Sequence, residues 1–217
     1  MIGTLLLDLD GTLVDSVPDL ASALDRLMAA RGLAGVSEAE TAAMVGDGAR
    51  KLVERAFAAR GQVADEAAME RFMADYGAHL ATATRPYPGV ETTLRDMTEA
   101  GWRLAVCTNK PAAMARELLA ALGLAALFRA IGGGDSFATR KPDPAHILAT
   151  LRAAGGTPER AVMAGDHAND VLAASGAGLP CIFAAWGYGP PAMARGAAAI
   201  AERFADLPPI ATRLLSR

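Results

Sequence analysis

The sequence has little cysteine. Its two cysteines, Cys107 and Cys181, both lie at an end of a short apolar segment. A disulfide between them is not expected of an intracellular chain. Cys107 could in principle act as a nucleophile, but a buried structural thiol is the commoner role.

Long apolar runs and an excess of positive charge are also missing. No segment approaches the ~20 apolar residues that a membrane helix needs, and no basic segment followed by an apolar stretch opens the chain as a signal peptide would. The formal net charge of −3 argues against nucleic acid or an anionic membrane as partner, because both require clustered lysine and arginine. We therefore expect a cytoplasmic protein.

What is present is ample apolar material for a core. The 217 residues, 52% of them hydrophobic, suffice for one domain or for a core domain with a smaller insert. Residues 16–84 predict several helices and no strand: Ser16 can start the first helix, and Ser37 with Glu40 resembles a capping box. Residues 85–89 contain two prolines and predict a stiff connector.

Helices and strands alternate outside this helical segment. Short apolar segments predict strands at residues 2–7, 103–107, 129–131, 161–164 and 179–184. Alternation of this kind, with strands apolar on both faces, predicts an α/β fold with a doubly wound parallel sheet, a Rossmann-like core. We expect a core domain of residues 1–15 and 86–217, and a helical cap of residues 16–85 inserted after the first strand.

Two aspartates directly follow the first predicted strand. In extended backbone Asp8 and Asp10 point to the same side, into one cleft. Two carboxylates ~4 Å apart repel by roughly 4 kcal/mol in a partly buried site. This repulsion implies that a cation, a proton or a chemical task uses the pair.

Polar residues also follow the later strands. Residues 107–111 offer a hydroxyl, an amide and a helix start, which suit phosphate oxygens. Residues 140–144 include a lysine, and residues 165–170 include two aspartates. Because ligands bind at the carboxyl ends of parallel strands, we expect these loops to meet. Each loop alone has a plain structural explanation, since such residues also cap helices or face solvent.

The segment from Asp8 to Ser16 resembles the first motif of the haloacid dehalogenase superfamily of aspartate-nucleophile phosphatases, and the later loops resemble its other three motifs. The resemblance implies that Asp8 is the nucleophile and Asp10 the general acid and base. It also implies that Thr108 and Lys141 hold the phosphoryl group, with Lys141 keeping Asp8 ionised.

The same resemblance implies a Mg²⁺ cofactor. Asp8, Asp10 through its carbonyl, and Asp166 would hold the ion, since oxygen ligands suit Mg²⁺. Asp170 is either a water-mediated ligand or the partner of Lys141. His167 departs from the small hydroxyl residue of many relatives, and we leave it out of the site.

Within the superfamily the chain is most similar to the phosphoglycolate phosphatases, through residues 45–50, 108–111, 131–135 and 186–189. Arg50 is the cap residue expected to bind a substrate carboxylate; Asn109 and Thr12 are further substrate-binding candidates. The expected partner is a small phosphate ester, and the protein a monomer or a homodimer. Two alternatives stay open: a β-phosphoglucomutase-like mutase or another small-ester phosphatase, and a phospho-accepting, receiver-like signalling module.

Overall fold

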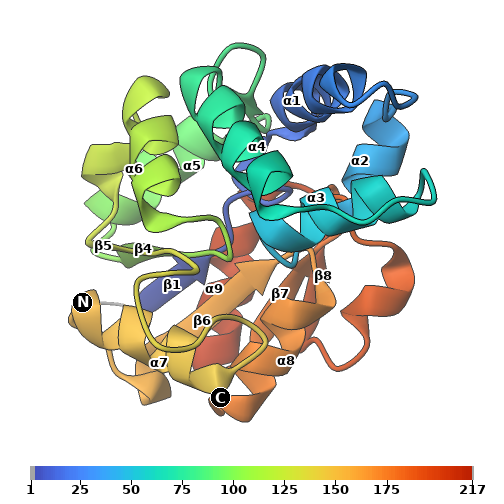
Figure 1. Cartoon of the computed structure of the whole chain (residues 1–217). Coiled ribbons are helices and arrows are strands. Elements are labelled where there is room, and N and C mark those ends of the chain that lie inside the picture. Colours follow the sequence, from blue (N-terminus) through green and yellow to red (C-terminus); the bar gives the residue numbers. More distant parts are fainter. Residues whose placement is uncertain (1–2, 217) are drawn as a thin grey trace.

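The computed structural model describes residues 3–216 and contains a parallel sheet with helices on both faces and a group of helices set off from it (Figure 1). The sheet strands are β1 (Thr4–Leu7), β4 (Arg103–Cys107), β5 (Ala130–Gly132), β6 (Ala161–Gly165), β7 (Cys181–Ala184) and β8 (Ala199–Ala201). Ile2, where the first strand was predicted to begin, lies outside the described residues.

The strand order β5-β4-β1-β6-β7-β8 is that of a doubly wound sheet, and every neighbouring pair is parallel. The chain builds outward from β1 to β5, then returns to β6 on the other side of β1. The carboxyl ends of β1 and β6 therefore flank the point where the direction of winding changes, which is where such sheets bind ligands.

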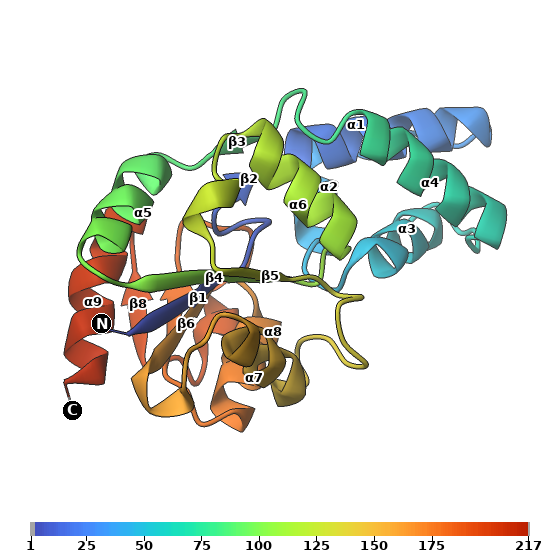
Figure 2. The ribbon, with the colours of Figure 1, turned by 90° about the vertical axis from the view of Figure 1, so that its left-hand side faces the viewer.

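The two faces of the sheet are covered by different helices. Helices α7 and α8 contact one face, and α5, α6 and α9 the other; in Figure 2 the sheet is nearly edge-on, with α5 and α6 above it and α7 and α8 below. Leu6 packs with the first set, and Leu5 and Leu7 with the second, as alternation along a strand requires. The helix bounds are α5 (Val90–Glu99), α6 (Ala112–Ala121), α7 (Pro144–Ala153), α8 (Ala168–Gly176) and α9 (Leu207–Leu215).

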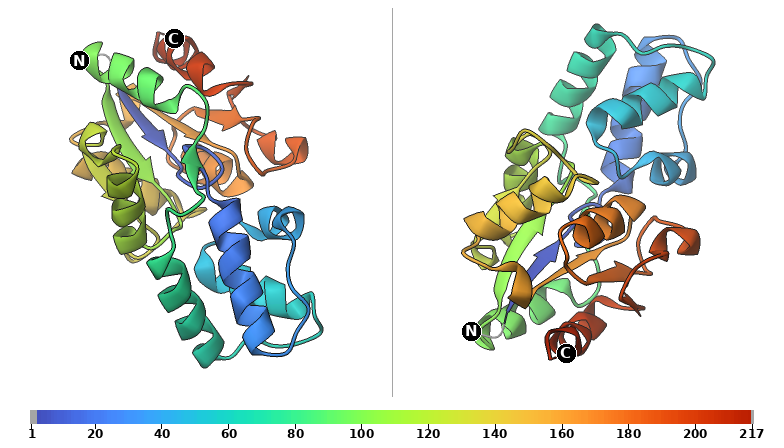
Figure 3. Two further views of the ribbon diagram at one scale, coloured as in Figure 1. Left: turned by 90° about the horizontal axis from the view of Figure 1, so that it is seen from above. Right: turned by 90° about the horizontal axis from the view of Figure 1, so that it is seen from below.

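The remaining helices form the insert. They lie together beside the carboxyl edge of the sheet in both views of Figure 3 and are α1 (Val17–Ala30), α2 (Glu38–Met44), α3 (Ala49–Ala58) and α4 (Glu66–Ala78). The predicted capping box at Ser37 and Glu40 is present. A short antiparallel pair, β2 (Val14–Asp15) with β3 (Arg85–Pro86), joins the two ends of the insert.

The predicted fold class is confirmed: a parallel sheet with a helical insert after its first strand. Strand β8 at the sheet edge was not predicted, and the segment that forms β3 was predicted as an unpaired connector. Between residues 3 and 216, none of the helices combines the length and the apolar content needed to cross a bilayer.

Candidate active site

Three aspartates meet at the carboxyl edge of the sheet. Asp8 follows β1, Asp166 follows the neighbouring strand β6, and Asp170 lies in the first turn of α8. One carboxylate oxygen from each lies within 4.8 Å of the others, and all three residues are buried. The fold thus gathers three acidic groups at the point where sheets of this kind bind ligands.

Lys141 lies against this cluster. Its Nζ is 2.9 Å from Asp8 Oδ1 and 2.6 Å from Asp170 Oδ1. Burial acts to lower the pKa of the ammonium, but the two carboxylates outweigh it and raise that pKa above its ordinary value. Lys141 therefore stays charged and offsets part of the repulsion in the cluster. Asp170 forms the ion pair with Lys141 that was one of the two roles left open for it.

Asp166 accepts two hydrogen bonds, from Thr12 Oγ1 at 2.9 Å and from the backbone N–H of Tyr188 at 2.8 Å. Burial, and then the negative charge of Asp8, raise the pKa of Asp166 to about 6 in spite of these bonds. Burial also raises the pKa of Asp170, against the effect of Lys141. Burial and the neighbouring carboxylates thus disfavour the ionised forms of both side chains.

The donor set of this cluster suits a hard divalent cation. Its potential ligands are carboxylate oxygens from Asp8, Asp166 and Asp170, and oxygen ligands are typical of Mg²⁺ and Ca²⁺ sites, whereas Zn²⁺ and Cu²⁺ sites commonly use histidine or cysteine. Among the described residues, this cluster contains neither a thiol nor an imidazole. The buried cluster is therefore capable of metal binding.

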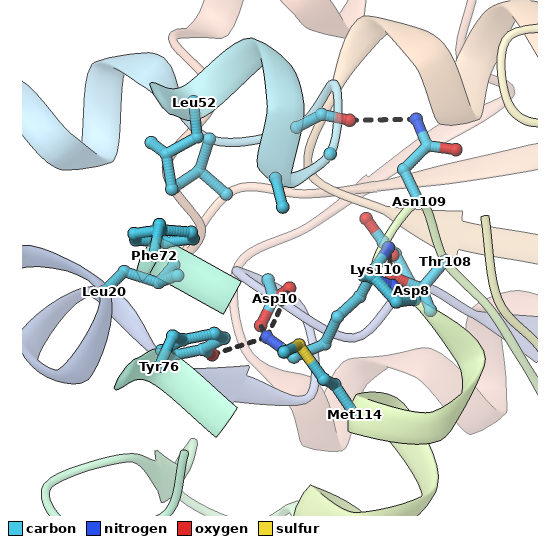
Figure 4. A pocket seen from close by; sticks show the side chains of 15 residues that line it. Asp8, Asp10, Leu20, Leu52, Phe72, Tyr76, Thr108, Asn109, Lys110 and Met114 are labelled. Carbon is cyan, nitrogen blue, oxygen red and sulfur yellow. Dashed lines mark hydrogen bonds and ion pairs between the residues drawn. The ribbon is translucent and has the colours of Figure 1, made fainter. Parts of the chain in front are cut away.

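Asp10 faces the insert and is paired with a lysine that was not assigned from the sequence. Lys110 Nζ lies 3.1 Å from Asp10 Oδ1 and donates to the hydroxyl of Tyr76, on α4, at 2.5 Å (Figure 4). The ammonium also lies 4.6 Å from the centre of the Tyr76 ring, a cation–π distance. Although burial acts to lower the pKa of Lys110, Asp10 and Tyr76 raise it above its ordinary value.

A cavity joins the sheet edge to the insert. Asp8, Asp10, Thr108 and Lys110 line its polar side, and apolar residues of the insert line the other, as Figure 4 shows. These apolar residues include Leu20, Leu52 and Phe72. A substrate with a charged end and a short carbon chain would match this division.

The loop between α2 and α3 closes over the sheet edge. Asn109 Nδ2 donates to the carbonyl of Gly46 at 3.0 Å, and Asn169 Nδ2 donates to the same carbonyl and to Asp47. Gly46 has a φ of +123°, and the ring of His167 lies where a β-carbon would be. A side chain at position 46 would therefore be strained and would push the loop from the site.

Two predicted substrate-binding residues lie away from this cavity. The Thr12 hydroxyl is fully buried and bonds to Asp166. Arg50 is paired with Glu66 at 2.9 Å, with about half of its side chain exposed, and lines a neighbouring cavity. Asn109 does line the main cavity, with its Nδ2 already bonded to Gly46 and to the Lys141 carbonyl.

Further residues of the site were missed from the sequence. Tyr188 links the cluster to the start of α1, because its N–H donates to Asp166 while its hydroxyl bonds to Asp15 and to the Ser16 N–H. His167, left out as a loop side chain, is half-buried and caps α8. Tyr188 and Lys110 both lie in segments that resemble the phosphoglycolate phosphatases, and this resemblance was the available signal.

Comparisons with known proteins define the class. Residues 2–178 match the model of the haloacid dehalogenase-like hydrolases, and the chain belongs to this family of hydrolases. It is 48% identical to a phosphoglycolate phosphatase of Agrobacterium fabrum over 83% of this chain and 79% of that protein. It is 41% identical to one of Caulobacter vibrioides over 98% of this chain and 92% of that protein.

A solved structure is also similar. It is that of a predicted phosphoglycolate phosphatase from Haemophilus somnus, with a TM-score of 0.88, 32% identity and coverage of 96% of this chain and 97% of that chain. The family resemblance predicted from the sequence motifs is thus confirmed.

Proposed function

We propose that the protein is a Mg²⁺-dependent phosphatase that hydrolyses a small phosphate monoester, with 2-phosphoglycolate as the favoured substrate, through an aspartyl-phosphate. One observation carries the proposal: Asp8 is ion-paired with Lys141 and lines the same cavity as Asp10. The names of the relatives support the substrate, since the curated proteins compared above are phosphoglycolate phosphatases.

In this mechanism Asp8 attacks the phosphorus with a carboxylate oxygen, and the bond from phosphorus to the ester oxygen breaks. Asp10 gives its proton to the departing alkoxide, then takes a proton from the water that attacks the phosphorus of the aspartyl-phosphate. Phosphate leaves, and Asp8 is restored. Lys141, which pairs with Asp8, positions the phosphoryl oxygens together with the Thr108 hydroxyl and the backbone N–H of Asn109, since the side-chain Nδ2 of Asn109 is already bonded.

Asp8, Asp166 and the carbonyl of Asp10 would hold the metal ion. Asp170 would not bind the ion directly and would stay paired with Lys141. The ion would supply positive charge that neutralises the phosphoryl group beside these carboxylates. We assign residues 1–15 and 86–217 to a catalytic core and residues 16–85 to a cap that excludes water when it closes. Arg50 stays the sequence-based candidate for binding a substrate carboxylate, although it is paired with Glu66.

The test is the release of inorganic phosphate from a panel of small phosphate esters in Mg²⁺, in parallel with chelator. We expect 2-phosphoglycolate to give the highest kcat/KM, and chelator to abolish release. Asp8→Asn is the matched control and should release none while keeping a cooperative melt. Conversion of a sugar phosphate without phosphate release would instead support a mutase, and a stable phosphoprotein without turnover would support a receiver-like module.

A further inference from the structure

Lys110 places a buried positive charge between the sheet and the insert. It follows β4 in the chain, and its side chain is 3% exposed. The ammonium contacts Asp10 on the sheet side and Tyr76 on the insert side (Figure 4). The chain has three lysines, Lys51, Lys110 and Lys141, and the proposed mechanism gives Lys110 no task.

The contact of Lys110 with Asp10 and Tyr76 leaves hydrogen-bond donors available to a ligand. A lysine ammonium has three N–H groups, and Lys110 directs them to one carboxylate and one hydroxyl. The Tyr76 hydroxyl accepts from Lys110, and among the described hydrogen bonds it donates none. Its own hydrogen is therefore available to a second acceptor, such as a carboxylate oxygen beside the ammonium.

Within the described chain, the other lysines and arginines do not line the cavities that contain Asp8 and Asp10. Two cavities share Asp8 and Asp10, and within the described chain Lys110 is the one lysine or arginine that lines either. Lys141 is held by the acidic cluster, and Arg50 lines a different cavity. An anionic group on the non-phosphate end of a substrate would therefore find its positive partner at Lys110.

The position of Asp10 determines how far a substrate carboxylate would lie from the Lys110 ammonium. A general acid must come within about 3 Å of the oxygen that it protonates, and Lys110 Nζ is 3.1 Å from the Asp10 carboxylate. In a two-carbon ester the carboxylate is separated from that oxygen by one CH₂ group. When the leaving oxygen of such a substrate contacts Asp10, the substrate carboxylate therefore lies beside the Lys110 ammonium.

We propose that Lys110, together with the hydroxyl of Tyr76, binds the substrate carboxylate and so determines the preference for a carboxylate-bearing phosphate ester. This inference rests on the proposed function. Because Lys110 belongs to the core and Tyr76 to α4 of the insert, a carboxylate held by both would also stabilise the closed arrangement of the two parts.

The test compares two esters that differ in one group: 2-phosphoglycolate and ethyl phosphate, in which a methyl replaces the carboxylate. The readout is the ratio of their kcat/KM values, so that any general effect on Asp10 cancels. Lys110→Met should lower the ratio by about 10- to 100-fold, the range for a lost charge-assisted hydrogen bond. Tyr76→Phe should lower it by about 3- to 10-fold.

Lys51→Met is the matched control, since this exposed lysine pairs with Glu54 outside the cavity and should leave the ratio unchanged. If Lys110→Met does not fold, Tyr76→Phe still decides. An equal fall for both esters in the variants would overturn the inference, as would a ratio that falls in Arg50→Ala and not in Lys110→Met. A wild-type protein that releases phosphate from neither ester would instead refute the proposed function.

Discussion

Replacing Asp166 by asparagine should make the metal-free protein more stable at neutral pH. The carboxylate is buried, and its pKa is raised to about 6 by burial and by Asp8. Asparagine can keep both hydrogen bonds, because its oxygen can accept from the Tyr188 N–H while its amide donates to the Thr12 hydroxyl. The substitution thus removes a charge and keeps a hydrogen bond to each partner, with the Thr12 hydroxyl changing from donor to acceptor.

The size of the effect follows from the pKa. A rise from 3.8 to about 6 is about two pKa units, and each unit corresponds to about 1.4 kcal/mol. Because the folded pKa is the higher one, the folded state binds the proton more tightly, and the wild type loses stability as pH rises from about 4 to about 6. Above that window Asp166→Asn should gain about 2–3 kcal/mol, or roughly 5–10 °C in Tm for a chain of this length.

Thermal melts of the wild type and of Asp166→Asn in chelator, at pH 4.5 and pH 7.5, measure this difference in stability. The difference in Tm should be large at pH 7.5 and mostly absent at pH 4.5, where the folded wild type is protonated at Asp166. Added Mg²⁺ should stabilise the wild type and have little effect on the variant. If Asp166→Asn melts below the wild type in chelator at pH 7.5, the carboxylate stabilises the empty site and the reasoning is wrong.

Three further outcomes are expected. Lys141→Met should lower the free energy of unfolding by about 3–5 kcal/mol, seen in denaturant melts, because it leaves Asp8 and Asp170 without their cation; an unchanged midpoint would contradict the buried ion pairs. Asp10→Asn should slow phosphorylation of Asp8 by an alkyl ester about 10²–10⁴-fold, yet p-nitrophenyl phosphate should still give a burst of nitrophenolate in rapid mixing, because this leaving group departs without a proton. Equal slowing of both esters would argue against a general acid. Ca²⁺ should replace Mg²⁺ poorly in phosphate-release assays, since it takes more and longer ligands, and full activity with Ca²⁺ would argue against this metal assignment.

The central part of the fold was predictable because its signals are local. Four apolar or small buried residues make β1, and Ser37 and Glu40 form the capping box that their spacing indicates. β8 was missed because three residues within an alanine-rich stretch carry no strand signal of their own. The pairing of β2 with β3 joins residues far apart in the chain, and Pro86 argued against a strand there.

In the candidate site, too, some residues could be predicted from the sequence and others could not. Asp8 and Asp166 follow strands, so the topology alone predicted that they lie together. The partner of Asp10 depends on how α4 packs over the sheet edge, which local patterns do not reveal; Lys110 and Tyr76 therefore had no assigned role. Arg50 was chosen for its guanidinium, but the choice could not anticipate its pairing with Glu66.

The pair of β2 and β3 has a consequence for how such a chain can change. Val14 lies opposite Pro86 and Asp15 opposite Arg85, so the insert leaves and re-enters the core at neighbouring points. A segment whose ends already meet can be exchanged as a module, because a substitute needs to span no gap and the strands on either side keep their positions. Residues 16–84 are thus a natural unit for building chimaeras, in which one catalytic edge is given a new choice of substrate.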